Sequence, residues 1–381
     1  MTAIIRNRLL LLLGLMGSSN CAFSQFIYLA NASNDVSAYS FDAKTRVLTQ
    51  APGSPFAAGM APAGVAVDSA SRFVYVANSG SNDVSAYMID GATGALTAVA
   101  LSPFAAGSAP AGVAVDPTGK FLYVANSESS DVSAYMIEAA TGALTPVPGS
   151  PFAAGSAPAG VAVDPVGKFL YVTNSGSGDV SAYRINPTNG VLTAVPGSPF
   201  AADQNAESVA IDPTGRLAYV TSANRRGRSV WVFAIDPASG ELAAIPGSAL
   251  AAGGGPLSVA VHPNGKFVYL ANGGDISAYA ASANTGASRL ISGSRFTRGL
   301  LWSGLVIDPT GKFVYGANDE SNNVSVYAVD GKTGVLQPVA ESPLGTSRPK
   351  GIAVGAATSV RSFRAAHRRW LWSHSPSAFR C

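Results

Sequence analysis

Histidine and cysteine are scarce in this chain, and their scarcity narrows the chemistry open to it. The 381 residues include only three histidines and two cysteines, and His367 and His374 lie close to the C-terminus. A structural or catalytic zinc site draws on three or four such ligands. A G-x-S-x-G nucleophile turn, an H-E-x-x-H pair and a phosphate-binding loop are also missing. We therefore expect neither a metal nor a cofactor.

Charged residues are few as well, at 12% of the chain, whereas there are 41 glycines and 24 prolines. This composition argues against long helices and suits short strands joined by tight turns. The net charge of +3 comes from the two ends, which carry seven arginines and no acids. Without those seven, residues 25–354 hold 18 basic and 22 acidic residues, a net charge of −4. Nucleic-acid binding needs a basic face, so we exclude it.

No hydrophobic run is long enough to span a bilayer, because the apolar stretch at 9–16 has too few residues. Two basic residues precede this stretch, and a small-residue cleavage site at 22–24 follows it. The pattern predicts a signal peptide over 1–24 and a mature protein that begins at Gln25, exported to the periplasm or the cell exterior. The alternative is a lipid anchor on Cys21. The preceding Asn20 argues against it, because a small apolar residue is expected at that position.

The opposite end, 355–381, has no repeat and contains five arginines and two tryptophans. We expect an irregular basic tail there, and the alternative is a basic amphipathic helix over 359–373. After removal of the signal peptide only Cys381 remains, which excludes an intramolecular disulfide.

What the chain does contain is one phrase repeated seven times, an aromatic-flanked Y-V-A-N. Its tyrosines follow one another at intervals of 47, 48, 48, 48, 50 and 46 residues: Tyr28, Tyr75, Tyr123, Tyr171, Tyr219, Tyr269 and Tyr315. A fixed period near fifty with several short strands per period is typical of a β-propeller. We predict an all-β, seven-bladed propeller.

One repeat reads as four antiparallel strands. Residues 112–115, 121–126 and 131–137 are apolar or alternating runs, and 143–147 is the outer edge, where Pro146 is tolerated because an edge strand can lack a donor. Phe152 follows, and we interpret it as an apolar plug between adjacent blades. The recurring turn aspartates (Asp116 in this repeat) and strand-end asparagines (Asn126) sit one blade apart, so we interpret them as local backbone and loop caps rather than calcium ligands.

The two ends of the repeat region complement each other. The first blade lacks an inner strand, because the mature chain starts with the second strand at Phe26, and the chain's last strand-like run, 351–354, is an inner strand without a blade. We predict that 351–354 pairs beside 26–31. This pairing would close the ring and define one domain over 25–354 without an open sheet edge.

These motifs resemble the lactonase-type seven-bladed propellers, which include 6-phosphogluconolactonase-like proteins, and the YVTN-repeat propellers of bacterial surfaces. The resemblance covers about 25–354. It rests on D-P-x-G-K-F at Asp116 and Asp164, on Y-V-A-N at Tyr123, and on T-G-x-L-T at Thr93 and Thr141. It implies a propeller fold and a sugar lactone as substrate.

The resemblance also points to His262, because a histidine-bearing turn occurs in lactonase-type members. In such members a glutamate often follows in the next loop, whereas here Asn272 is followed by two glycines and Asp275. His262 stands where sister blades have the turn aspartate. We therefore interpret it as a solvated turn residue and keep catalysis as the alternative.

The fifth blade breaks the repeat and is the best place to look for a site. Its incoming connection carries Asp203 and Glu207, and the loop between its second and third strands carries Arg225, Arg226 and Arg228. Both segments are expected on one face of the disc. We expect Arg298 and Trp302, from a later connection, on the same face. Ion pairs on a drifted blade are the structural alternative.

Two functions follow from this asymmetry. The first is a scaffold that binds an anionic small molecule or a protein partner at this face and at the mouth of the central channel, using the five ligand-binding candidates Arg225, Arg226, Arg228, Arg298 and Trp302. The second is a hydrolase that opens a sugar lactone, with Glu207 or Asp203 as the base and Arg225 or Arg228 beside the oxyanion. The repetitiveness of the chain favours the first.

Overall fold

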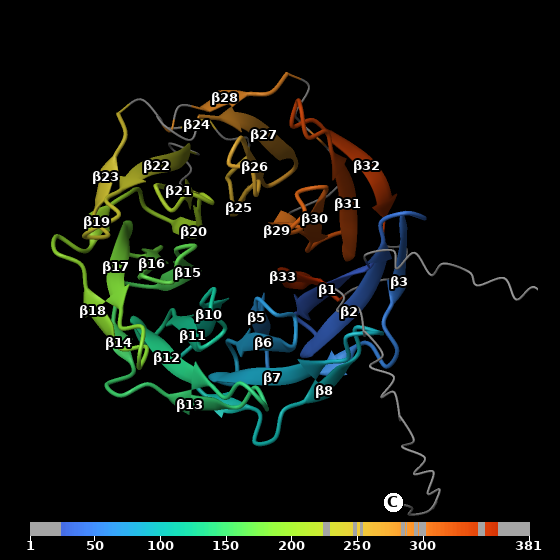
Figure 1. The fold of residues 1–381 in the computed structure, drawn as a ribbon, viewed down its shortest axis with the longest axis horizontal. Helices are drawn as coiled ribbons and strands as arrows, with labels where there is room; N and C mark the ends of the chain where they lie inside the picture. Colours follow the sequence, from blue (N-terminus) through green and yellow to red (C-terminus); the bar gives the residue numbers. More distant parts are fainter. Residues whose placement is uncertain are drawn as a thin grey trace, which may run out of the picture.

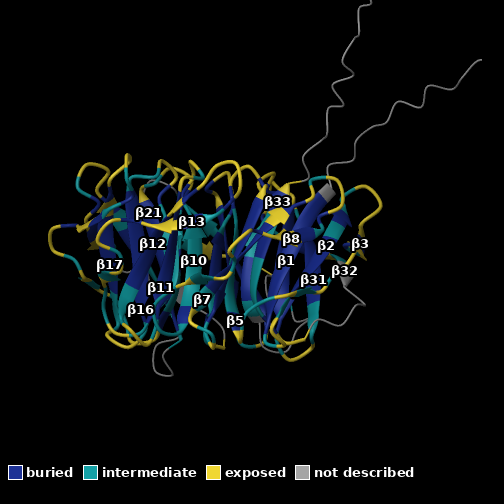
Figure 2. Ribbon diagram, turned by 90° about the horizontal axis from the view of Figure 1, so that it is seen from below, coloured by how far each residue is buried: buried dark blue, intermediate teal, exposed yellow. Residues whose placement is uncertain are grey.

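The computed structural model describes residues 24–356 except 224–228, 247–249, 252–253, 283–285, 287, 293–295, 297–301 and 342–346. Seven antiparallel sheets stand around a common axis and form a closed disc (Figure 1). Seen from the side, the strands are mostly buried and the exposed residues gather on the two faces of the disc (Figure 2). The predicted seven-bladed propeller is confirmed.

Each blade has four main strands, and blades 1 to 7 are numbered in chain order of their second strands. The inner strands are β33 (Pro349–Ala356), β5 (Pro62–Val67), β10 (Pro110–Val115), β15 (Pro158–Val163), β20 (Ala206–Ile211), β25 (Ser258–Val261) and β29 (Trp302–Ile307). The second strands are β1 (Ser24–Asn31), β6 (Phe73–Asn78), β11 (Phe121–Asn126), β16 (Phe169–Asn174), β21 (Leu217–Ser222), β26 (Phe267–Ala271) and β30 (Phe313–Asn318).

The two outer positions complete each sheet. The third strands are β2 (Asp35–Asp42), β7 (Asp83–Ile89), β12 (Asp131–Ile137), β17 (Asp179–Ile185), β22 (Ser229–Ile235), β27 (Ile276–Ala281) and β31 (Asn323–Val329). The outer strands are β3 (Val47–Gln50), β8 (Leu96–Ala98), β13 (Leu144–Pro146), β18 (Leu192–Ala194), β23 (Leu242–Ala244), β28 (Ser288–Leu290) and β32 (Leu336–Glu341).

Blades 1 to 5 add a two-residue strand that the sequence did not predict. These strands pair with the third strand of their own blade: β4 (Phe56–Ala57), β9 (Phe104–Ala105), β14 (Phe152–Ala153), β19 (Phe200–Ala201) and β24 (Leu250–Ala251). Phe152 is the first residue of β14 and packs against a cluster that joins residues of blades 3 and 4, such as Val132 and Leu170. The predicted plug between blades is therefore confirmed, and it is held by strand pairing as well as by apolar contact.

The ring closes as expected. β33 pairs antiparallel with β1, with Phe26 opposite Gly355 and Leu29 opposite Ile352, so the last described strand supplies the inner strand of blade 1. The side-chain amide of Gln25 donates a hydrogen bond to Asp308 Oδ2 of blade 7 at 2.9 Å. Because the ends of the chain meet in one sheet, the described part of the ring has no open edge at its seam.

The repeated polar residues hold turns and blades together. Asp116 accepts hydrogen bonds from the backbone amides of Lys120 and Phe121, both at 2.7 Å, which confirms its role as a turn cap. Asn126 is buried and donates to Asp131 at 2.6 Å. The tyrosine of the repeat links neighbouring blades, since Tyr75 donates to the carbonyl of Gly142 in the next blade at 3.0 Å.

Candidate functional site

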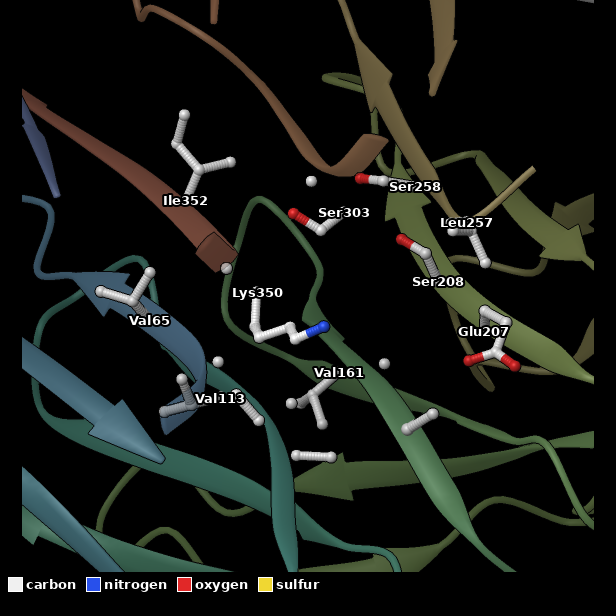
Figure 3. A pocket seen from close by; sticks show the side chains of 18 of the residues that line it. Val65, Val113, Val161, Glu207, Ser208, Leu257, Ser258, Ser303, Lys350 and Ile352 are labelled. Carbon is white, nitrogen blue, oxygen red and sulfur yellow. The ribbon is translucent and has the colours of Figure 1, made fainter. Parts of the chain in front are cut away.

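A cavity of about 510 Å³ lies on the axis of the ring, and we call it the axial cavity. It is lined by residues from the inner segments of all seven blades (Figure 3). One position varies strongly between blades, and we call its seven residues the variable ring: Ala63, Ala111, Ala159, Glu207, Leu257, Ser303 and Lys350. Among the described residues, Glu207 and Lys350 are the two ionisable groups that line the cavity.

The register of the inner strands shows that these positions are equivalent. Pro110 at the start of β10 lies opposite Asn126, Ala206 at the start of β20 lies opposite Ser222, and Pro349 at the start of β33 lies opposite Asn31. The variable-ring residue follows directly in each case. Three consecutive blades thus present alanine to the cavity, and the next blade presents a carboxylate.

Glu207 is the acidic member of the variable ring. Its side chain is partly buried, and within the described part of the chain it has no hydrogen bond or ion pair of its own. Burial raises the pKa of the Glu207 carboxyl above its ordinary value, because the charged form loses water without gaining a partner. A carboxylate with a raised pKa is a stronger base than an exposed one.

The backbone of Glu207 is held from the neighbouring blade. Thr173 of β16, where β11 has Ala125, donates from Oγ1 to the Glu207 carbonyl at 3.1 Å. The same hydroxyl accepts a hydrogen bond from the amide of Gly160 at 2.8 Å. Thr173 is fully buried, so it fixes the strand that carries Glu207 against the strand before it.

Lys350 approaches the cavity from the ring-closing strand β33. Its ammonium forms an ion pair with Asp319 Oδ2, and the other oxygen of Asp319 pairs with Arg348 Nε at 3.2 Å. The side chain of Asp319 is 13% exposed and that of Lys350 is 35% exposed. Lys350 therefore faces the cavity with its charge already shared (Figure 3).

Around the ring, Glu207 and Lys350 are separated by three alanines on one side and by Leu257 and Ser303 on the other. A proton acceptor and a cation in one cavity can activate water and stabilise a negatively charged oxygen, which are the two needs of ester hydrolysis. Within the described residues no group of three His, Cys, Asp or Glu side chains could hold a metal ion.

Asp203, the other acidic candidate of the fifth blade, lies outside the axial cavity. Asp203 accepts a hydrogen bond from the Gln204 amide at 2.9 Å and is not among the residues that line the cavity. Its segment does run against the loop after β21, since Ser222 donates to the Gln204 carbonyl at 2.8 Å and the Ala223 amide to the Asn205 carbonyl at 3.0 Å. The predicted placement of both segments on one face is confirmed at these described ends.

The five predicted ligand-binding residues remain predictions. Arg225, Arg226, Arg228 and Arg298 lie outside the described residues. Trp302 begins β29, next to the cavity-lining Ser303, but its side chain is also outside the described part.

His262 is not solvated, so that interpretation was wrong. The residue is 6% exposed, and its Nε2 lies 2.8 Å from the carbonyl oxygen of Gly311 in the next blade. The Asn264 amide donates to Nδ1 at 3.1 Å, which makes Nε2 the donor nitrogen. The turn follows the end of β25, whereas the variable-ring residue Leu257 precedes this strand. His262 thus lies at the far end of the strand from the variable ring and is absent from the cavity lining.

Sequence reasoning missed Lys350 and Thr173. A comparison of the inner segments alone reveals Lys350, because the sequence reads P-A-G-V three times and then A-E-S-V, P-L-S-V, W-S-G-L and P-K-G-I. Thr173 differs from Ala125 within an otherwise repeated strand. Lys350 departs from the repeat at a position that lines the axial cavity. Thr173 departs from it at a position that supports the strand carrying Glu207.

Fold and cavity together define a seven-bladed β-propeller with an axial pocket of small-molecule size. The model of the family described as lactonase, 7-bladed beta-propeller, matches residues 21–151, 146–255 and 244–350. The chain belongs to this lactonase family of seven-bladed propellers. Comparison with curated proteins gives no match.

Solved structures show the same fold at low sequence identity. A protein of Bacteroides fragilis provisionally assigned as a 6-phosphogluconolactonase is 19% identical, with a TM-score of 0.76 over 89% of this chain and 99% of that one. The periplasmic gluconolactonase of Pseudomonas aeruginosa is also 19% identical, with a TM-score of 0.72 over 88% and 100%. Hydrazine synthase of Kuenenia stuttgartiensis is 21% identical, with a TM-score of 0.60 over 80% and 95%. At these identities the likeness concerns the fold.

Among the described residues there is no helix of the length and apolarity that a membrane span requires.

Proposed function

We propose that the axial cavity binds a small lactone and that the chain opens the lactone ring by hydrolysis. The observation that carries the proposal is Glu207, a partly buried carboxylate with a raised pKa and no described partner, in the same cavity as Lys350. Family membership and the names of two similar structures favour lactones among esters.

In this mechanism the Glu207 carboxylate takes a proton from a water molecule, and the water oxygen attacks the lactone carbonyl carbon. Negative charge develops on the carbonyl oxygen, where the Lys350 ammonium stabilises it. The ring C–O bond then breaks, and the departing alkoxide receives the proton from Glu207. One lactone and one water give one hydroxy acid, which ionises to a carboxylate.

Binding without turnover is the second candidate function, and it uses the same cavity. What favours it is the position of His262, which is absent from the lining of the axial cavity and donates to the Gly311 carbonyl. In this case Glu207 and Lys350 would orient a polar ligand. The arginines Arg225, Arg226, Arg228 and Arg298 would add contacts to an anionic group at the mouth.

The deciding experiment is hydrolysis of neutral lactones by the purified full chain and by Glu207→Gln, corrected for the uncatalysed rate. Glutamine keeps the shape and removes the base, so we expect kcat to fall by about 10²- to 10⁴-fold. Melting temperature should be unchanged or slightly higher, because a buried charge without a partner is removed.

The matched control is Glu128→Gln, an exposed acid between β11 and β12. It should leave the rate unchanged. A rate at the uncatalysed level for the unaltered chain would leave ligand binding as the function, and full activity in Glu207→Gln would refute the role of this carboxylate.

Export also belongs to the proposal, on the strength of the N-terminal sequence alone. The basic residues Arg6 and Arg8, the apolar run at 9–16 and the small residues at 22–24 support a cleaved signal peptide. N-terminal sequencing of protein recovered from the periplasm or medium should begin at Gln25. A start at Met1, or a lipid on Cys21, would refute that cleavage site.

A further inference from the structure

Three of the seven blades give the axial cavity an apolar wall. Blades 2, 3 and 4 each present an alanine of the variable ring, followed by a glycine and a valine. A Cβ added to Gly112 would lie 2.1 Å from the carbonyl oxygen of Ala159, and one added to Gly64 would lie 2.2 Å from that of Ala111. Glycine at these positions allows neighbouring inner strands to approach this closely. We call the lining segments 63–65, 111–113 and 159–161 the alanine wall.

The remaining four blades supply most of the polar side chains of the lining, together with the apolar Leu257, Leu305 and Ile352. Their polar groups include the Glu207 carboxylate, the hydroxyls of Ser208, Ser258 and Ser303, and the Lys350 ammonium. Serine replaces the glycine of the alanine wall at Ser208 and Ser258. A ligand in this cavity therefore meets apolar side chains on the alanine wall, and both hydrogen-bonding and apolar side chains on the other side (Figure 3).

The charge of the cavity is unsuited to a phosphate ester. The lining holds one carboxylate and one ammonium, and Asp319 already pairs with that ammonium. A phosphate monoester brings a charge of about −1.5 to −2 and is usually held by several cationic or amide donors. Within the described residues the cavity offers it one shared cation and a repelling carboxylate.

We infer that the axial cavity selects an unphosphorylated lactone that carries an apolar substituent. The substituent packs on the alanine wall, and the ester group turns toward Glu207 and Lys350. This inference rests on the proposed function for its ester chemistry, but its selectivity comes from the wall and the charge balance.

The test compares three six-membered lactones with the purified full chain: δ-nonalactone, which carries an alkyl chain, δ-gluconolactone, which carries hydroxyls, and its 6-phosphorylated form. After correction for spontaneous hydrolysis, kcat/KM should be highest for δ-nonalactone, by about tenfold or more over δ-gluconolactone. The phosphorylated lactone should remain at the background rate.

Two variants assign the selectivity to its causes. Ala111→Ser with Ala159→Ser adds hydroxyls to the alanine wall and should lower the preference for δ-nonalactone by about tenfold, with little change for δ-gluconolactone. Asp319→Asn releases the ammonium of Lys350. It should create inhibition by inorganic phosphate that the unaltered chain does not show.

Calorimetry with the lactam analogue of δ-nonalactone separates the two proposals. Selective binding of this lactam without turnover of any lactone would refute the proposed hydrolysis and support the inference. Hydrolysis of the phosphorylated lactone at a rate equal to or above that of δ-nonalactone would overturn the inference and leave the hydrolase in place. An equal change for all three lactones in the double serine variant would also overturn it, and an absence of both binding and turnover would overturn both proposals.

Discussion

Blades 2 to 4 and the arc from blade 5 around to blade 1 are made of equivalent strands but present different side chains to the axial cavity. In blades 2, 3 and 4 the variable-ring residue is alanine. The buried asparagine of each of these blades donates to an aspartate at 2.6 Å, as it also does in blades 1 and 6. Blade 5 departs from this pattern, because Ser222 and Ser229 replace the asparagine and the aspartate. Trp231 replaces the serine that also accepts a hydrogen bond from the asparagine in the other blades, such as Ser133. Blades 2 to 4 thus supply the alanine wall, and the arc from blade 5 around to blade 1 supplies the ionisable groups of the cavity.

This contrast teaches where function can arise in a repeat protein. Identical blades give identical surfaces, so a cavity on the axis becomes chemically directional only where blades differ. Glu207 and Lys350 occupy the same register as three alanines. Four of the seven variable-ring positions depart from alanine, and Glu207 and Lys350 among them give the axial cavity its ionisable groups.

The largest effect should come from moving the carboxylate by one blade. In Glu207→Ala with Ala159→Glu, the axial cavity keeps its net charge but the carboxylate lies on β15. We expect kcat to fall by about 10²- to 10⁴-fold on δ-nonalactone, as for Glu207→Gln. Activity in the transplant near that of the unaltered chain would show that the position of the acid is unimportant.

The unaltered chain should also lose activity on the acidic side at higher pH than an exposed glutamate would predict. The base acts when deprotonated, and burial raises the pKa of Glu207, so the rate should rise with pH through this raised value. A pH profile of kcat/KM that stays flat through the weakly acidic range would contradict Glu207 as the base.

The next effect concerns stability and the close approach of inner strands. Gly112→Ser places a Cβ against the Ala159 carbonyl and should lower the free energy of unfolding by about 1–3 kcal/mol. Ser208 at the equivalent position of blade 5 already has a Cβ, so Ser208→Gly should cost less than about 1 kcal/mol. Urea denaturation of both variants checks the difference, and equal losses would remove the distinction between the arcs.

Alkaline pH should weaken the fold through buried tyrosines. Burial raises the pKa of Tyr135 to about 12, whereas blade 5 has Phe233 at the equivalent position. A tyrosine in the unfolded chain ionises at about pH 10, so the unfolded state loses protons first and the free energy of unfolding falls as pH rises from about 10 toward 12. Denaturant midpoints across this range should show the decline, and Tyr135→Phe should make it shallower. An unchanged slope would mean that Tyr135 does not contribute.

The smallest effect compares two tyrosines of the repeat. Tyr75→Phe removes the hydrogen bond to Gly142 and should cost about 1 kcal/mol of unfolding free energy. The hydroxyl of Tyr315 is buried without a partner among the described residues, so Tyr315→Phe should be neutral or stabilising. Thermal unfolding of the two variants distinguishes them, and an equal loss would indicate a shared packing role for both rings.

The fold could be predicted because the repeat determines it. Seven tyrosines at a nearly constant interval count the blades, and the unpaired strand-like run at 351–354 completes the incomplete first blade. The two-residue strands such as β14 were missed, because a pair of residues carries no periodicity of its own.

The site could be predicted only in part. Glu207 was found because it breaks the repeat in a segment that differs throughout. Lys350 was overlooked, because it is a single change within a normal strand, and its partner Asp319 lies on another blade. The burial of His262 depends on Gly311 of the next blade, where an added Cβ would lie 2.5 Å from the imidazole ring. Contacts between blades of this kind do not appear in the pattern of one repeat.

The ring-closing strand has a consequence for the life of the chain. Because Lys350 lies on β33, the last strand of the propeller to leave the ribosome brings both the closing sheet and the ammonium of the axial cavity. A nascent or truncated chain that stops before this strand has Glu207 but no complete pocket. Completion of the axial cavity and pairing of the open sheet edge, which protects against aggregation, therefore depend on the same final strand.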